Sequence, residues 1–180
     1  MKRVEVTDGS PPPRSDACQA FVALGSNLGH SAQIIRLAFD RLQSLSVTPL
    51  LRSSLWRSTP VDCPPGSPDF VNAVAGLTPR PGETPKSLLA ELQKLEREFG
   101  RQAKKVLNEP RPLDLDLIAF GREIRATKEL ALPHPRAQLR RFVLQPLSEI
   151  APDLILPGQI RSVDQLLRDL ASQDRIFKLD

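Results

Sequence analysis

The sequence predicts an α/β (α+β) fold in which helices pack on a mostly antiparallel sheet. Two strand–helix–strand passages can be followed along the chain, over residues 20–58 and 70–120. With 40% hydrophobic residues, a chain of 180 residues can bury one compact core. Most of the 18 prolines stand where an element should begin or end, so they do not indicate general disorder. We expect one domain over residues 19–180, preceded by a disordered tail at residues 1–18.

The first passage starts with a short apolar strand at residues 20–24, which the sequence GSN at residues 25–27 ends in a tight turn. Ser31 is suited to cap the helix that follows. Apolar residues of this helix recur at three- and four-residue steps, namely Ile34, Ala38, Leu42 and Leu45. A strand is expected at residues 53–58. Residues 59–68 are too rich in proline for a strand and should form a functional loop.

The second passage starts with a strand at residues 70–77, whose alternation places Phe70 and Asn72 on one face. The helix after it has the clearest signals, because Thr84 is a good N-cap and Gly100 is a good stop. Its apolar stripe consists of Leu88, Leu92, Leu95 and Phe99.

The rest of the chain supplies the last strand and further helices. Residues 101–112 should form a basic loop, and residues 113–120 a strand. A helix is expected at residues 137–149, followed by short elements near residues 154–156 and 163–170. The short connections are compatible with an antiparallel sheet, and among such folds we choose the ferredoxin-like arrangement.

The charge balance is mildly basic, with 25 Lys and Arg against 21 Asp and Glu and a formal charge of +4. It suits a nucleotide-binding enzyme as readily as a nucleic-acid-binding protein. The residues after Met1-Lys2-Arg3 include acids and prolines where a signal peptide needs an apolar run, and no segment has transmembrane length. We therefore expect a cytoplasmic protein with no membrane partner. Cys18 and Cys63 form no zinc-binding pattern and should stay reduced.

The strongest local motif is the sequence RPLDLDL at residues 111–117. Residues two apart in a strand point to the same side, so Asp114 and Asp116 should project together while the leucines face the core. Two adjacent carboxylates repel each other, and a Mg²⁺ ion shared with substrate phosphates would stabilise them. The alternative is an edge strand whose solvent face happens to be acidic.

Cationic residues lie close to this motif. Arg101, Lys104, Lys105 and Arg111 belong to the loop that enters the strand, and such cations suit phosphate oxygens. For the two lysines we prefer a solvated surface, and for Arg111 we prefer a role beside the aspartates. His134 stands between two prolines, where it can donate to an anion, although an isolated histidine is more often a surface residue.

Several separated motifs occur in an order that is specific as a set. They are FVALGSNLG (21–29), RSTP (57–60), PDFVNA (68–73), GR (100–101), PRPLDLD (110–116), LPH (132–134) and FVLQPLSEIAP (142–152). With these motifs the chain resembles the 6-hydroxymethyl-7,8-dihydropterin pyrophosphokinase family, over residues 21 to 157 and beyond. The resemblance implies a ferredoxin-like fold, ATP as the diphosphate donor, two Mg²⁺ ions and AMP as the second product.

The resemblance also implies roles for individual residues. Asp114 and Asp116 match metal-binding aspartates, and Arg101 and Arg111 match phosphate-contacting arginines. Further residues on the ATP side of the site are Gln93, Glu96, His134 and Arg140.

On the pterin side, Phe70 and Phe142 match an aromatic pair that sandwiches the ring, and Asn72 matches a residue that hydrogen-bonds its polar edge. The loop that lines the same pocket is represented by Thr59, Pro60 and the backbone near Asp62. A flat heteroaromatic ring gains from stacking between two aromatic side chains. Without the resemblance, ordinary core packing would be the preferred interpretation of the two phenylalanines.

The implied reaction is in-line attack of the substrate hydroxyl on the β-phosphorus of ATP, with AMP as the leaving group. No general base is assigned, because either Asp116 or coordination of the hydroxyl to a metal could provide the activation. The chain departs from the family at Ala103, Asn108 and Pro135, where some relatives carry arginine, tryptophan and tyrosine. These departures concern nucleotide contacts.

Two rival functions remain open at this point. A ferredoxin-like RNA-binding module would need exposed aromatic residues on its sheet, and the chain has no string of glycines and aromatics of that kind. A degenerate relative would bind nucleotide or pterin without turnover. We expect a monomer whose partners are ATP and 6-hydroxymethyl-7,8-dihydropterin, and no nucleic acid.

Overall fold

The computed structural model describes residues 19–60, 63–102, 109–171 and 175–179. Its main sheet has the strand order β5-β1-β4-β3-β8, with β2 also paired to β4, and all these pairings are antiparallel. The strands are β1 (Ala20–Ser26), β2 (Leu51–Arg52), β3 (Trp56–Ser58), β4 (Phe70–Leu77), β5 (Asp114–Phe120) and β8 (Ile176–Lys178). The order β5-β1-β4-β3, with a helix in each crossover, is ferredoxin-like, so the predicted fold class is confirmed.

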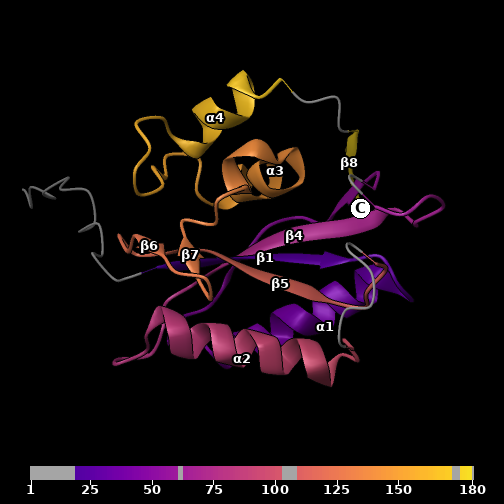
Figure 1. The fold of residues 1–180 in the computed structure, drawn as a ribbon, viewed down its shortest axis with the longest axis horizontal. Helices are drawn as coiled ribbons and strands as arrows, with labels where there is room; N and C mark the ends of the chain where they lie inside the picture. The colour runs from indigo at the N-terminus through magenta and orange to yellow at the C-terminus, as the bar shows by residue number, and fades with distance from the viewer. Residues whose placement is uncertain (1–18, 61–62, 103–108, 172–174, 180) are drawn as a thin grey trace, which may run out of the picture.

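Helices cover both faces of this sheet (Figure 1). They are α1 (Ser31–Gln43), α2 (Pro85–Glu98), α3 (Arg141–Ile150) and α4 (Val163–Asp169). The pair α1 and α2 lies on one face, and the pair α3 and α4 lies on the other. A hairpin of β6 (Arg125–Ala126) and β7 (Ala131–Leu132) follows β5, and a 3₁₀ helix (Ala137–Leu139) precedes α3. Among the described residues, no helix is long and apolar enough to cross a membrane.

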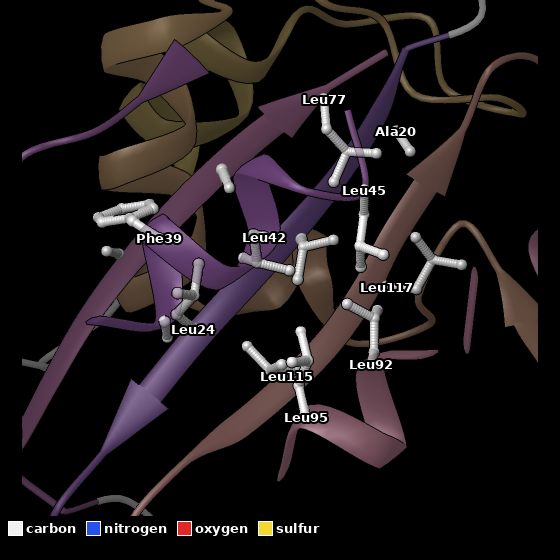
Figure 2. Close-up of a cluster of buried hydrophobic side chains, with 14 of the residues drawn as sticks. Ala20, Leu24, Phe39, Leu42, Leu45, Leu77, Leu92, Leu95, Leu115 and Leu117 are labelled. Carbon is white, nitrogen blue, oxygen red and sulfur yellow. The ribbon is translucent and has the colours of Figure 1, made fainter. Parts of the chain in front are cut away.

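The larger core lies between the sheet and the helices α1 and α2 (Figure 2). Leu24 of β1 and Leu115 and Leu117 of β5 belong to it, together with Leu42 and Leu92 from the two helices. None of these five side chains is more than 4% exposed. Burial of one such leucine contributes about 1.5–3 kcal/mol. This core therefore fixes β5, the strand that carries the two aspartates.

The opposite face of the sheet carries a second core beneath α3 and α4. Phe21 of β1, Val74 of β4 and Ile118 of β5 contribute to it from three adjacent strands. On β1 the second core reaches Ala23, and at the row of Gly25, the next residue on the same face, the neighbouring strands carry the polar residues Asn72 and Asp114. One end of this face is therefore left clear of the apolar core, and the candidate site lies there.

A β-bulge interrupts the pairing of β1 with β5. The register shifts between Phe21 and Val22, which leaves Ile118 as the extra residue of β5. The carbonyl oxygen of Ile118 accepts a hydrogen bond of 2.8 Å from the backbone N–H of His134. This bond attaches the segment after β7 to the strand and holds His134 near the acidic motif.

The elements with strong local signals are confirmed. The helix between Thr84 and Gly100 is α2, and Thr84 forms a reciprocal capping box with Ser87. The strands predicted at residues 70–77 and 113–120 are β4 and β5. Ser31, in contrast, is the first residue of α1 and not its cap, because the cap position belongs to His30. The buried stripe of α1 consists of Ile35, Ala38, Phe39 and Leu42.

The predicted helix at residues 137–149 is wrong near its start. Arg140 is extended, with φ −119° and ψ 112°, and separates the 3₁₀ helix from α3. Apolar periodicity did not indicate this break because apolar residues stand on both sides of it at helical spacing. The strand expected at residues 53–58 is shortened to β3, and residues 154–156 form neither helix nor strand. The sequence does not predict β6, β7 or β8.

Candidate active site

The acidic motif has the predicted orientation. Asp114 and Asp116 lie on one face of β5, and the alternate residues Leu113, Leu115 and Leu117 are buried on the other. β5 is an outer strand of the sheet, so the edge-strand alternative is correct about its position. The acidic face is nevertheless not an open one, because the side chain of Asp114 is only 19% exposed.

Two arginines hold Asp114 from both sides. Arg101 Nη1 lies 2.6 Å from Asp114 Oδ1, and Arg111 Nη2 lies 2.8 Å from Asp114 Oδ2. Arg101 also forms an ion pair with Glu96 of α2. Because these side chains are largely buried, removal of one partner would leave an uncompensated charge in a poorly solvated place. The network therefore places two guanidinium groups at the start of β5.

Glu96 connects this network to the sheet. Its Oε1 accepts a hydrogen bond of 2.7 Å from the backbone N–H of Leu115. Burial, together with the charges of Asp114 and Asp116, raises the pKa of Glu96 to about 7, although the Leu115 N–H and Arg101 act in the opposite direction. A carboxyl group in this setting exchanges a proton near neutral pH.

Asp116 also lies in a place that disfavours its charge. Burial raises the pKa of Asp116, and so does the neighbouring Asp114 carboxylate, while His134, Arg140 and Arg111 oppose this effect. Burial lowers the pKa of His134, and Asp116 opposes that shift. Two neighbouring carboxylates in a partly desolvated place are a setting that a divalent cation stabilises.

The donor set fits a magnesium ion that keeps part of its coordination for the substrate. Asp114 and Asp116 offer hard oxygen ligands, and Mg²⁺ in nucleotide sites commonly uses one or two carboxylates plus phosphate oxygens. In the part of the chain that the structure describes, no group of three or more His, Cys, Asp or Glu residues forms a closed metal cage. The site therefore suits an ion that arrives with phosphates.

A cavity of about 710 Å³ opens beside the two aspartates. It lies between the last turns of α2, the start of β5 and the segment that carries His134 and Arg140. Its lining includes all the residues predicted for the metal and ATP: Gln93, Glu96, Arg101, Arg111, Asp114, Asp116, His134 and Arg140. Its volume lies in the range of small-molecule sites, and Pro135 and Arg136 also line it.

Phe70 and Phe142, two of the residues predicted for the pterin, do not line this cavity but contact the lining residues Arg111 and Arg140. Phe70 is only 9% exposed yet belongs to neither apolar core, which argues against ordinary core packing. The Arg111 guanidinium lies over its ring at 5.6 Å. Phe142 is partly buried against the second core, with the Arg140 guanidinium over its ring at 5.4 Å. Both rings thus have a flat cationic group over one face.

Asn72 is buried on the same face as Phe70, and its Nδ2 donates a hydrogen bond of 2.9 Å to Ser58 Oγ. In the predicted pterin loop, Thr59 is exposed and Pro60 is half-buried. Several residues named from the sequence lie outside the described residues, namely Asp62, Ala103, Lys104, Lys105, Asn108 and the predicted tail.

One row across the sheet joins the two sides of the site. Asp114 of β5 is paired with Gly25 of β1, and Gly25 is paired with Asn72 of β4. All three residues lie on the face that carries α3 and α4, because alternate residues of their strands belong to the second core. The acidic motif on β5 and the predicted pterin residue Asn72 on β4 therefore flank Gly25, and only the strand β1 separates them.

Asn27 is a site residue that sequence reasoning treated only as part of a turn. It is 3% exposed, and its Oδ1 accepts a hydrogen bond of 2.9 Å from the backbone N–H of Arg111. Its own backbone N–H donates to the carbonyl oxygen of Arg111 at 3.2 Å. The turn predicted at GSN is wrong, because Gly25 and Ser26 are the last two residues of β1. The burial of Asn27 depends on a segment far along the chain, which the local motif does not report.

Known proteins resemble this chain over most of its length. The sequence model of the family "7,8-dihydro-6-hydroxymethylpterin-pyrophosphokinase (HPPK)" matches residues 21–152. A Haemophilus influenzae protein named 2-amino-4-hydroxy-6-hydroxymethyldihydropteridine pyrophosphokinase is 39% identical over 87% of this chain and 96% of its own length. The Pseudomonas aeruginosa protein of the same name is 41% identical over 77% of this chain and 84% of its own length.

Solved structures share the fold at low sequence identity. Wild-type HPPK-DHPS of Plasmodium falciparum with pteroate superposes with a TM-score of 0.66 at 12% identity. The match covers 84% of this chain and 42% of that longer chain. The family model and the bacterial relatives together show that this chain belongs to the 7,8-dihydro-6-hydroxymethylpterin-pyrophosphokinase family.

Proposed function

We propose that the protein transfers diphosphate from ATP to the hydroxymethyl group of 6-hydroxymethyl-7,8-dihydropterin and releases AMP. The observation that carries this proposal is the row Asp114–Gly25–Asn72. At one end of the row, Asp114 is held by two arginines in a cavity large enough for a nucleotide. At the other end, Asn72 and Phe70 offer a polar edge and an aromatic face to a heterocycle.

Arg101 and Arg111 are proposed to bind the phosphates of ATP. The Nε of Arg111 is buried and, among the described residues, has no hydrogen-bond partner. An unpaired buried donor is costly, and a phosphate oxygen is a strong acceptor for a guanidinium fork. If either arginine turns from Asp114 to a phosphate, the Asp114 carboxylate oxygen with which it was paired becomes available to a metal ion. The same movement therefore binds the nucleotide and prepares Asp114 as a ligand.

We propose that Asp114 and Asp116 hold Mg²⁺, with two ions as the family resemblance implies. When bound, Mg²⁺ neutralises phosphate charge and orients the transferring group. His134 and Arg140 line the same cavity as Asp116 and interact electrostatically with it, so they can donate to phosphate oxygens there. Positioning and electrostatic stabilisation are the main contributions that a phosphoryl-transfer site makes.

The pterin is proposed to stack on Phe70 and Phe142. Each ring has a flat guanidinium over one face, with the guanidinium carbon 5.6 and 5.4 Å from the ring centre, so each ring already packs against a planar group. Because the Nδ2 of Asn72 donates a hydrogen bond to Ser58 Oγ, the Oδ1 of Asn72 is suited to accept a hydrogen bond from an N–H of the pterin. Thr59, Pro60 and Asp62 would complete this pocket from the loop after β3.

We assign no general base. Asp116 faces the cavity and is one candidate, and a substrate hydroxyl acidified by metal coordination would need none. We also propose a monomer whose partners are small molecules. A relative that binds the same ligands without turnover would keep the same cavity, so the reaction itself separates the two functions.

Product analysis tests the proposal. The protein is incubated with ATP, Mg²⁺ and 6-hydroxymethyl-7,8-dihydropterin, and the products are separated by chromatography and assigned by phosphorus NMR. We expect AMP and pterin diphosphate in equal amounts, and none of either after chelation of the metal with EDTA. ADP with a pterin monophosphate would place the attack on the γ-phosphorus and contradict the proposal. Binding of both ligands without any product would favour a non-catalytic relative.

A further inference from the structure

Gly25 is an unusual residue for its position. It lies inside β1, paired with Asn72 on one side and with Asp114 on the other. Glycine weakens a strand interior, because it loses more backbone entropy on folding and has no side chain to pack. Gly25 is not among the glycines with positive φ, so its backbone conformation does not require glycine. Its identity needs another explanation.

Packing does not explain the missing side chain. A Cβ built on Gly25 would lie 3.7 Å from Asn72 Oδ1, 3.9 Å from Asp114 Cβ and 3.9 Å from Phe70 Cδ1. These are ordinary van der Waals distances, so a methyl group would fit without displacing a neighbour. Gly76 of β4 differs, because a Cβ there would come within 3.2 Å of Leu51 and Phe21.

Residues of both proposed binding sites, for the pterin and for the metal and phosphates, surround the space above Gly25. Asn72 and Phe70 belong to the proposed pterin pocket, and Asp114 belongs to the proposed metal and phosphate site. None of these three nearest neighbours of a Cβ at position 25 belongs to the second core. The backbone of Gly25, which carries no side chain, therefore forms the surface between the proposed pterin pocket and the proposed metal and phosphate site.

We propose that Gly25 is a specificity-determining residue on which the exocyclic carbon of the pterin lies when its hydroxyl meets the diphosphate. This inference rests on the proposed function and adds a residue to it. A methyl group at position 25 would lift the acceptor off the strand, away from both Asn72 and Asp114. Misplacement by about 1 Å can reduce a rate about 100-fold.

The substitution Gly25→Ala gives a distinctive expected result. Alanine accepts the extended backbone at no steric cost and restricts the unfolded chain, so the melting temperature should stay equal or rise. In the same protein, kcat/KM for the pterin should fall about 100-fold. Affinity for a non-hydrolysable ATP analogue should stay within about threefold of the parent, less than 1 kcal/mol, because Gly25 does not line the nucleotide cavity.

Gly82→Ala is a matched control with the opposite expectation. Gly82 has φ +82° and no atom within 4 Å of a built Cβ, so alanine there is strained but unobstructed. It lies in the turn before α2 and does not line the cavity. We expect a lower melting temperature and a parental kcat/KM. Together the two variants separate loss of stability from loss of substrate space.

Steady-state kinetics, pterin binding in the presence of the ATP analogue, and melting curves are measured on the full-length parent and both variants. Lower kcat/KM and weaker pterin binding in Gly25→Ala, with an unchanged or raised melting temperature, support the inference. The inference is overturned if Gly25→Ala keeps the parental kcat/KM and pterin binding. It is also overturned if kcat/KM falls together with a lowered melting temperature. If the parent forms no AMP with pterin, the proposed function fails. The pterin binding of Gly25→Ala then decides alone whether position 25 contacts the ligand.

Discussion

Asn27 and Arg111 exchange two hydrogen bonds that join the end of β1 to the start of the acidic motif. The Arg111 N–H donates to Asn27 Oδ1 at 2.9 Å, and the Asn27 N–H donates to the Arg111 carbonyl at 3.2 Å. The Asn27 amide also reaches the carbonyl of Pro68 at 3.5 Å, the limit of a hydrogen bond. Asn27 thus links the segments before β4 and before β5, and it fixes where Arg111 enters the site.

Asn27→Ala should destabilise the protein and weaken catalysis. It leaves the Arg111 N–H without an acceptor, which costs about 1–3 kcal/mol in a buried setting. Asn27→Asp keeps the acceptor and should retain more stability, so it serves as the matched control. Urea unfolding gives the free energies, and AMP formation gives the activity. Equal stability of the parent and Asn27→Ala would show that the two hydrogen bonds are not important to the fold.

Substitution of the two aspartates should change stability in opposite directions in metal-free buffer. Asp116→Asn removes a charge that burial and Asp114 disfavour, so it should raise the free energy of unfolding at neutral pH. Asp114→Asn breaks both arginine pairs and should lower it by on the order of 3 kcal/mol. Thermal melts in EDTA measure both. Two equal shifts would mean that the arginine network does not distinguish the two carboxylates.

The raised pKa of Glu96 predicts that the free energy of unfolding depends on pH. Its pKa rises from an ordinary 4.5 to about 7 on folding, so the folded state binds the proton more tightly. The stabilisation that this proton provides is fully present below about pH 4.5 and is lost as the pH rises through about 7. Glu96→Gln has no such proton, so its unfolding free energy should fall less than that of the parent across this window. Parallel curves for the two proteins in metal-free urea titrations would contradict the assignment.

Arg111→Lys should impair catalysis more than folding. Lysine keeps the charge beside Asp114 but cannot supply the guanidinium fork, and it lacks the flat group over Phe70. We expect a loss of about 100-fold or more in kcat, as for removal of one preorganised donor. Arg41→Lys, at the exposed ion pair with Glu98, is the control and should leave kcat unchanged. A parental kcat in Arg111→Lys would remove Arg111 from the phosphate site.

Local signals explain which elements were predictable. Thr84 caps α2 and Gly100, with φ +90°, ends the helical segment, so both boundaries can be recognised within a few residues. β8 has only three residues and becomes a strand by pairing with β3, more than a hundred positions earlier in the chain. Such pairing leaves no local pattern. The break at Arg140 was missed because the spacing of apolar residues does not report a single extended residue.

The same distinction applies to the site. The period of two in a strand predicts that Asp114 and Asp116 share a face, and the structure agrees. The bond from Leu115 to Glu96 joins residues 19 positions apart, and the bond from Arg111 to Asn27 joins residues 84 positions apart. Neither contact follows from composition or spacing. The family resemblance named Glu96, but only the fold shows that it holds Arg101 and the start of β5 together.

The most direct measurement is AMP formation from ATP and Mg²⁺, with and without 6-hydroxymethyl-7,8-dihydropterin, in the parent and in Asp114→Asn and Asp116→Asn. We expect pterin-dependent AMP from the parent and its loss in both variants, including Asp116→Asn, which should be no less stable than the parent. Pterin-dependent AMP at the parental rate from both variants would contradict the proposal that these carboxylates hold the metal of a pyrophosphokinase.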